Sequence, residues 1–412
     1  MSSSKCRFCH TPLEQTFADL GMSPISNAFL KPGQLKLKEP FYPLHAYVCG
    51  NCMLVQLEQF ESPGVIFNEE YAYFSSFSDT WLKHAKLYAD EMVKRFGLAQ
   101  SSFVVEIASN DGYLLQYFVE KNIPVLGIEP SANVAEAARK RGVDTLVKFF
   151  GVNSAKELVS KGRQADLLLG NNVLAHVPDL NDFVAGMKIL LKSGGVITME
   201  FPHLLRLMRE NQFDTIYHEH FSYFSFLTVE KVFTRHGLTL FDVQPLSTHG
   251  GSLRIFAKHA EDPSKEVTNA VHALLAEERG ANLDKLAAYD EFAEKVRITK
   301  RKFLQFLIQA KESGKSVVAY GAPAKGNTLL NYCGVRTDFI DYAVDRSPHK
   351  QGMFLPGTHI PIYEPDRIFR TKPDYLLILP WNLKGEVIQQ MSGIRNWGGQ
   401  FVVPIPEVTV IA

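Results

Sequence analysis

Between residues 103 and 201, short apolar runs alternate with longer amphipathic segments. Apolar runs bounded by Gly, Pro or Asn are typical of buried parallel strands, and the amphipathic segments between them indicate crossover helices. The predicted strands cover residues 103–109, 125–130, 145–149, 166–172 and 196–201. The predicted helices include residues 79–96, 133–141 and 179–191. This alternation predicts an α/β fold with a doubly wound domain, which binds its ligand at the C-terminal ends of the strands.

The residues at these strand ends indicate which kind of ligand the domain binds. Glu129 ends the second strand, where an acid can accept hydrogen bonds from a ribose diol. After Glu106 the first strand leads into residues 108–112, Ala-Ser-Asn-Asp-Gly, which lack the glycines of a pyrophosphate-binding turn. A cofactor with a ribose and no phosphates therefore fits best, and S-adenosylmethionine is the common one. The candidate cofactor-binding residues are Glu106, Ala108, Asn110, Gly112, Tyr113, Glu129, Asn171 and Asn172.

This pattern resembles the class I methyltransferases, whose first strand ends in an acid followed by a glycine-rich loop. Ala108 and Asn110 stand at positions where that family often has glycines. The resemblance implies a Rossmann-like central domain that binds S-adenosylmethionine.

Four of the five cysteines form two Cys-x-x-Cys pairs, Cys6 with Cys9 and Cys49 with Cys52. Each pair places two thiolates on one tight turn, and two such turns complete a tetrahedral zinc site with four sulfur ligands. Because four thiolates leave no open coordination position, we expect a structural zinc. Redox-active dithiols are the alternative. Cysteines at this spacing also suit a reducing compartment better than disulfides.

Residues 213–223 place His218, Glu219 and His220 in a row among aromatic and hydroxyl side chains. Histidine is the usual general base near neutral pH, and a neighbouring carboxylate can orient it. The segment is no zinc-protease helix, because the residue four positions after His218 is Ser222. From spacing alone either histidine could be the base, and an aromatic structural turn is an equal alternative. His176, just after the fourth strand, is either functional or a helix-cap residue.

Three other segments carry candidate ligand-binding residues. Residues 71–78 form an aromatic and hydroxyl cluster, which could belong either to the core or to a pocket. Paired glycines within 248–254 allow a close approach to a ligand, although Arg254 there fits a surface carboxylate slightly better than a phosphate. Residues 321–328 open a helix of a second, smaller α/β domain, and Lys325 at such a helix start could receive a phosphate. Plain α/β packing is the alternative.

The whole-chain properties exclude some classes of function. With 412 residues, the chain exceeds one ordinary core, so two or three domains are expected. Lys plus Arg and Asp plus Glu both number 44, which argues against nucleic-acid binding. We find neither an apolar signal segment nor an apolar run long enough to span a membrane, so a cytoplasmic protein is expected.

Taken in this order, the motifs resemble those of the nucleotide-sugar C-methyltransferases of deoxysugar biosynthesis, such as the dTDP-sugar C-3 methyltransferases. The segments that carry the resemblance are the two cysteine pairs and residues 71–76, 106–113, 172–177, 214–223 and 248–254. The resemblance implies a zinc-binding N-terminal domain (1–75), a methyltransferase domain (76–260), and a helical connector with a C-terminal Rossmann-like domain (261–412). It also implies a nucleotide-sugar substrate, expected to be dTDP-linked, and a monomer is the working expectation.

The resemblance further assigns roles to individual residues. It makes His220 the base, with Tyr217 and Glu219 beside it, and matches Tyr71 and His176 to the same pocket. The substrate-binding candidates are Tyr73, Phe74, Ser75, His218, His249, Arg254, Lys325 and Asn327.

The expected chemistry is methylation of a carbon next to a ketone. In a 4-keto sugar, a base can remove the C3 proton to give an enolate, whose oxygen needs hydrogen-bond donors. The enolate then attacks the sulfonium methyl group. Two alternatives stay open: a sugar O-methyltransferase in which His220 deprotonates a hydroxyl, and a non-catalytic zinc-ribbon binding protein.

Overall fold

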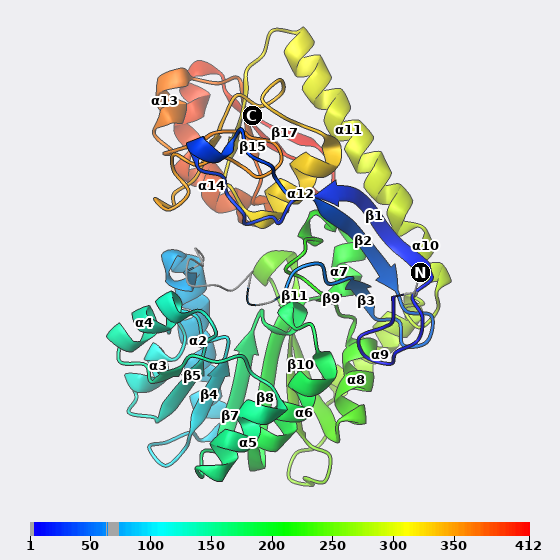
Figure 1. Cartoon of the computed structure of the whole chain (residues 1–412), viewed down its shortest axis with the longest axis vertical. Helices are drawn as coiled ribbons and strands as arrows, with labels where there is room; N and C mark the ends of the chain where they lie inside the picture. The colour runs from blue at the N-terminus through cyan, green and yellow to red at the C-terminus, as the bar shows by residue number, and fades with distance from the viewer. Residues whose placement is uncertain (1–3, 63, 65–73) are drawn as a thin grey trace.

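The computed structural model describes residues 4–62, 64 and 74–412, and three β-sheets organise these residues (Figure 1). The largest sheet forms the lower half of the molecule as drawn, and the C-terminal sheet lies above it. The N-terminal strands run along one side, next to a long helix. Among the described residues, no helix combines the length and the apolar character that crossing a bilayer requires.

The large sheet has seven strands in the order β10-β11-β8-β7-β4-β5-β6. Strands β4 to β8 are parallel, whereas β11 is antiparallel to β8 and β10 is antiparallel to β11. Their bounds are β4 (Val104–Ile107), β5 (Val125–Ile128), β6 (Thr145–Leu146), β7 (Ala165–Asn171), β8 (Leu191–Pro202), β10 (Leu238–Leu246) and β11 (Ser252–His259). This arrangement confirms the predicted doubly wound domain.

Helices cover both faces of this sheet (Figure 1). They are α2 (Asp79–Phe96), α3 (Gln116–Val119), α4 (Ala132–Lys140), α5 (Val152–Ser160), α6 (Leu180–Leu190), α7 (Leu204–Arg209) and α8 (Phe226–Arg235). Helix α2 has the predicted bounds because Ser78 accepts a hydrogen bond from the Trp81 N–H at its start and Gly97 ends it with a φ of 61°. Strand β8 begins earlier than predicted, since Gly194 and Gly195 lie within an irregular stretch of its pairing with β7.

The N-terminal sheet has the order β1-β2-β3-β9, and its last strand comes from the central part of the chain, after β8 of the large sheet. Its strands are β1 (Gln15–Ser23), β2 (Tyr42–Val48), β3 (Val55–Leu57) and β9 (Ser222–Tyr223). Val55 pairs with Tyr223 and Gln56 with Ser222, so the chain enters this sheet directly after His220. The antiparallel β9–β3 pair therefore fixes one end of the segment that carries the candidate base.

The C-terminal domain has a six-stranded sheet in the order β14-β13-β12-β15-β16-β17, parallel except for β17. Its strands are β12 (Val317–Tyr320), β13 (Ala343–Val344), β14 (Ile362–Tyr363), β15 (Tyr375–Ile378), β16 (Gln400–Val403) and β17 (Thr409–Ile411). The helices after the large sheet are α9 (Asn269–Gly280), α10 (Ala287–Asp290), α11 (Phe292–Glu312), α12 (Ala324–Cys333), α13 (Arg367–Thr371) and α14 (Lys384–Gln390). Of these, α9 packs against α8 and β10 of the large-sheet domain.

Residues 24–39 of the N-terminal part reach across to the C-terminal domain, as the dark blue segment in the upper half of Figure 1 shows. The Leu30 N–H donates to the Phe354 carbonyl at 3.0 Å, and Glu39 pairs with His359 at 2.8 Å. This segment and β9 both cross the predicted domain limits, which stay predictions. The three parts of the chain therefore share one packed centre.

Candidate active site and zinc centre

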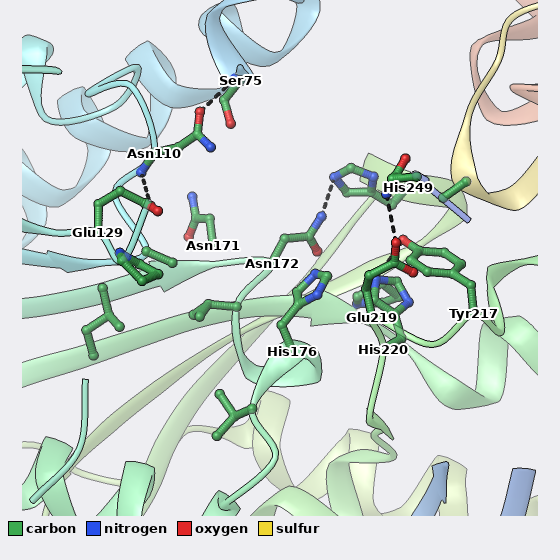
Figure 2. Close-up of a pocket in the computed structure, with 18 of the residues that line it drawn as sticks. Ser75, Asn110, Glu129, Asn171, Asn172, His176, Tyr217, Glu219, His220 and His249 are labelled. Atoms are coloured by element: carbon green, nitrogen blue, oxygen red, sulfur yellow. Dashed lines mark hydrogen bonds between the residues drawn. The ribbon is translucent and has the colours of Figure 1, made fainter. Parts of the chain in front are cut away.

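A cavity of about 380 Å³ lies at the C-terminal ends of β4, β5 and β7, and residues 323–325 and 350 of the C-terminal domain also line it. All three parts of the chain line it, through Asn27, Glu129, His220 and Lys325 among others. Figure 2 shows Asn110 and Glu129 at one end and His176, Tyr217, Glu219 and His220 at the other. Asn171 and Asn172 lie between these two groups.

Glu129 holds the loop that follows the first strand. Its carboxylate accepts hydrogen bonds from the backbone N–H groups of Asn110, at 3.0 Å, and Ser131, at 2.9 Å. Burial raises the pKa of Glu129, and these two backbone donors oppose the rise. Because each carboxylate oxygen has a second acceptor position and the residue lines the cavity, Glu129 can still accept a hydrogen bond from a ligand diol.

The loop keeps the geometry of a glycine-rich turn although two of its glycine positions are substituted. Ala108, Asn110 and Gly112 all have positive φ, of 55°, 49° and 76°. A left-handed alanine costs on the order of 1–2 kcal/mol, whereas asparagine visits this region routinely. The Asn110 side chain also accepts the Ser75 N–H at 2.9 Å. At Gly112 a Cβ would also lie tightly, 3.0 Å from Val143 and 3.3 Å from Ala138, so glycine fits this position best.

Other predicted cofactor residues line the cavity or lie buried below it. The buried amide of Asn171 faces the cavity with neither its oxygen nor its nitrogen hydrogen-bonded within the described part of the chain. This is the fit expected of residues that hold a polar cofactor. Tyr113 lines the cavity, whereas Glu106 lies buried below the loop. Burial raises the pKa of Glu106 well above its ordinary value, and a hydrogen bond from Tyr113 opposes the rise.

His220 is held in one tautomer by two hydrogen bonds. Its Nδ1 lies 3.0 Å from the Thr215 carbonyl oxygen, and its Nε2 lies 2.8 Å from the Tyr217 hydroxyl. Because a carbonyl only accepts, Nδ1 carries the proton and Nε2 carries the lone pair, which accepts the Tyr217 O–H. The His176 ring packs edge-on at 4.7 Å between centroids. Burial, and then His176, lower the pKa of His220 well below its ordinary value, so the ring is neutral at pH 7.

Glu219 and His218 point to different surroundings. Glu219 is 3% exposed, its Oε1 accepts from Asn27 Nδ2 at 3.1 Å, and burial raises its pKa to about 7. His218 instead bonds the Pro43 carbonyl at 3.2 Å and packs against Tyr42, outside the cavity lining. Of the two histidines that spacing could not separate, His220 therefore lies at the cavity.

The C-terminal domain contributes Lys325, whose Nζ donates to Asn382 Oδ1 at 2.9 Å and lies 4.4 Å from the centre of the Trp381 ring. Burial lowers the pKa of Lys325, and the charge of Asp214 opposes this. The Asp214 carboxylate accepts the Trp381 indole N–H at 2.7 Å, and burial raises its pKa to about 6. A cation from one domain and an acid from another thus meet around one tryptophan.

Some of the predicted substrate residues line the cavity, and others do not. His249 and Ser75 line the cavity, and His249 bonds Asn172 at 2.8 Å. Phe74 packs against His349 of the C-terminal domain, and Arg254 binds Glu200 at 2.7 Å and Glu91 at 2.8 Å beneath the cavity. Asn327 bonds the Ser26 carbonyl. Tyr71 and Tyr73 lie outside the described residues.

Sequence reasoning missed several residues that line the cavity, among them Asn27, Trp81, Phe150 and Lys350. Trp81 stacks on Tyr113 with ring centroids 5.9 Å apart and meets His249 edge-on at 5.0 Å. The position of Trp81 in the first turn of a helix after the 71–78 cluster is the signal that could have identified it. Asn27 carries no such signal, because only long-range contacts bring it to the cavity.

The four cysteines form a zinc site. Their Sγ atoms all lie within 4.8 Å of one another, with Cys6 and Cys52 3.5 Å apart and Cys9 and Cys49 3.4 Å apart. A tetrahedral zinc with Zn–S bonds of about 2.3 Å needs sulfurs about 3.8 Å apart, so the cluster fits.

Both cysteine turns share one backbone design. The residue after each pair, His10 or Met53, has a positive φ, and its N–H donates to the carbonyl of the first cysteine at 2.9 and 3.0 Å. This repeat confirms the predicted pair of knuckles. Gln56 also donates a hydrogen bond to the Cys6 sulfur at 3.2 Å.

Three family models match the chain in succession. Residues 6–67 match a "Putative zinc binding domain", residues 81–243 a methyltransferase domain, and residues 247–406 a C-methyltransferase C-terminal domain. The C-methyltransferase NovU of Streptomyces niveus is 36% identical over 411 residues, which is 99% of this chain and 97% of that protein.

Two further matches cover only part of the chain. The ubiquinone biosynthesis O-methyltransferase of a Chelativorans species is 26% identical over 95 residues, 23% of this chain and 38% of that protein. The crystal structure of an S-adenosylmethionine-dependent methyltransferase from Clostridium acetobutylicum is 14% identical, covers 43% of this chain and 92% of its own, and has a TM-score of 0.35.

Proposed function

This chain belongs to the C-methyltransferase family, and on that premise we propose that it methylates a ring carbon of a nucleotide-linked 4-keto deoxysugar, at C3. Its reaction class is S-adenosylmethionine-dependent methyl transfer to carbon. The proposal concerns the acceptor, the methylated position and the residues that act on them.

The proposal rests mainly on His220, a neutral histidine whose Nε2 lone pair lies at the cavity. A ring carbon becomes nucleophilic only after a proton leaves from beside a carbonyl group, so the acceptor needs a base. His220 is neutral at pH 7, its Nδ1 is committed to the Thr215 carbonyl, and its Nε2 lone pair lies at the same cavity as Glu129. A general base for the acceptor and a candidate cofactor site therefore share one cavity.

We assign the proton transfer to Nε2 of His220 and the stabilisation of the enolate oxygen to Tyr217 and His176. Nε2 has one lone pair and cannot accept the Tyr217 hydroxyl and the C3 proton together. When the proton moves to Nε2, the Tyr217 hydroxyl therefore turns to donate to the enolate oxygen. The Tyr217 hydroxyl and the enolate oxygen are therefore hydrogen-bonded to each other once the C3 proton has been removed.

S-adenosylmethionine supplies the electrophilic methyl group when it is bound. Glu129, Asn171 and the loop of Ala108 and Asn110 would hold it at the other end of the cavity. The cavity orients the acceptor between the two ends, and such positioning contributes much of the rate of a bimolecular transfer.

The proposal of a nucleotide-linked acceptor rests on the cations of the C-terminal domain. Lys325 and Lys350 both line the cavity, and α12 starts beside them at Ala324. A helix N-terminus with adjacent lysines favours an anionic group such as a diphosphate. We propose that this domain holds the diphosphate while the sugar reaches His220.

The experiment is a panel of nucleotide-linked 4-keto deoxysugars incubated with the zinc-loaded protein and S-adenosylmethionine. The proposal expects a new carbon-bound methyl group at C3, detected by mass spectrometry and NMR. A methyl group on oxygen would establish the O-methyltransferase alternative instead. Methyl transfer to none of these sugars, by protein that binds the cofactor, would contradict the proposed acceptor.

A further inference from the structure

Two adjacent residues near the start of α12, Asn327 and Thr328, reach into two other parts of the chain. Asn327 Nδ2 donates to the Ser26 carbonyl at 2.6 Å, and Thr328 Oγ1 donates to the Ile216 carbonyl at 3.0 Å. Asn327 and Thr328 are each 1% exposed. Each of these side chains therefore supplies a buried hydrogen bond to a backbone that belongs to another domain.

Both carbonyls immediately precede a residue of the active site. Ile216 is followed by Tyr217, which bonds His220 at 2.8 Å. Ser26 is followed by Asn27, which lines the cavity and bonds Glu219 at 3.1 Å. The N-terminal half of α12 thus holds the chain at two points, one beside the Tyr217–His220 pair and one beside Asn27, the partner of Glu219.

The same half of α12 carries Lys325 into the cavity, so a displacement of α12 would move three contributions to the site together. Asn327 itself does not line the cavity, and its side-chain amide donates to the Ser26 carbonyl. The substrate-binding role predicted for Asn327 stays a prediction, and the structure adds the contact to Ser26.

We propose that Asn327 and Thr328 are positioning residues, through which the C-terminal domain fixes Tyr217, His220 and Glu219 in their working geometry. The proposal rests on the proposed role of the Tyr217–His220 pair. It gives the C-terminal domain a second task besides substrate binding, since the catalytic segment depends on contacts from α12.

Three variants of the full, zinc-loaded chain separate the hydrogen bond from the shape of the side chain. Thr328→Val removes the hydroxyl at constant volume, and Thr328→Ser keeps it. Thr371→Val is the control, because the exposed Thr371 in α13 makes a hydroxyl contact to the carbonyl four residues earlier, as Thr328 also does with Ala324. Its other hydroxyl contact, to Tyr342, stays within the C-terminal domain. Thr371 lies away from the cavity lining.

With a dTDP-linked 4-keto-6-deoxy sugar as the probe, Thr328→Val should lower kcat roughly 10-fold to 100-fold, as expected for a small misplacement of reacting groups. KM and the cofactor Kd should stay within about twofold, and Thr328→Ser should restore kcat. The control should resemble the wild type. An unchanged kcat in Thr328→Val, or an equal loss in Thr328→Ser, would overturn the proposal.

Asn327 is tested by a double-mutant cycle. If it acts through Asn27, then Asn27→Ala combined with Asn327→Ala should lose no more activity than the larger single variant. Independent, additive losses would contradict this part of the proposal.

A crystal structure of Thr328→Val tests the positioning without any substrate. The turn from Ile216 to His220 should shift and the Tyr217–His220 hydrogen bond should lengthen or break; an unchanged turn overturns the proposal. Failure of the wild type to methylate the probe would instead count against the proposed substrate alone.

Discussion

The Tyr217 hydroxyl lies 2.8 Å from Nε2 of His220, and the Thr215 carbonyl holds the opposite nitrogen of the same ring at 3.0 Å. These two contacts define which nitrogen can take a proton and which group can donate one in return. Tyr217→Phe should therefore lower kcat about 100-fold, because it removes one donor to the developing oxyanion. Steady-state kinetics checks this, with the cofactor Kd as the internal control; an unchanged kcat would exclude Tyr217 as a donor.

Glu219 should make the protein less stable as the pH rises. Burial raises its pKa from an ordinary 4.5 to about 7, so the folded chain holds a proton that the unfolded chain releases above pH 4.5. The stabilisation is complete below pH 4.5 and is lost as the pH rises to 7, by about 3 kcal/mol. Because glutamine does not titrate, the Glu219→Gln variant should not lose this stability as the pH rises.

Denaturant unfolding of both proteins at several pH values measures the effect. The free energy of unfolding of Glu219→Gln should exceed that of the wild type by about 3 kcal/mol at pH 8 and match it at pH 4.5. The exposed Glu266 offers a control, since Glu266→Gln should follow the wild-type curve. Parallel curves for Glu219→Gln and wild type would show that Glu219 titrates normally.

The zinc site should contribute to folding. Cys49→Ser removes one of four thiolates, and because metal-binding free energy is part of folding free energy, zinc content and folded yield should both fall. Metal analysis alongside circular dichroism checks this. A zinc-free variant that folds and turns over like the wild type would show that the site is dispensable.

Glu129→Ala should weaken S-adenosylmethionine binding about 10-fold to 150-fold, the equivalent of a charge-assisted hydrogen bond of roughly 1.5–3 kcal/mol. Titration calorimetry measures this directly. Asp144→Ala is the control, because Asp144 pairs with Arg163 outside the cavity lining. Equal affinity in Glu129→Ala would leave Glu129 as a residue that only holds the loop.

Local sequence patterns predicted the parts of the fold that depend on local physics. The apolar runs predicted β4 to β8, and the end of the second run placed the acid Glu129 at the end of β5. The spacing of the cysteines predicted the zinc knuckles. Each of these features depends on residues that are close in sequence, or on strands whose order follows from right-handed crossovers. A few neighbouring residues are therefore enough to predict each of these features.

Contacts between distant segments could not be predicted from local sequence patterns. Strand β9 has only two residues and pairs with β3, so no periodicity marks it. Asn27 and Asn327 became neighbours of the site through a contact that spans 301 positions. The different surroundings of His218 and His220 likewise depend on Pro43 and Thr215, which the spacing of the two histidines cannot specify.

The most direct test of the proposed mechanism is hydrogen exchange at the reacting carbon. With a nucleotide-linked 4-keto sugar in D2O and the demethylated cofactor bound, the wild type should introduce deuterium at C3 without methylation. His218→Asn should exchange at nearly the wild-type rate, because His218 lies outside the cavity lining. His220→Asn should lose both exchange and methylation while its cofactor Kd stays near that of the wild type. Exchange at the wild-type rate in His220→Asn would contradict the central claim that His220 is the base.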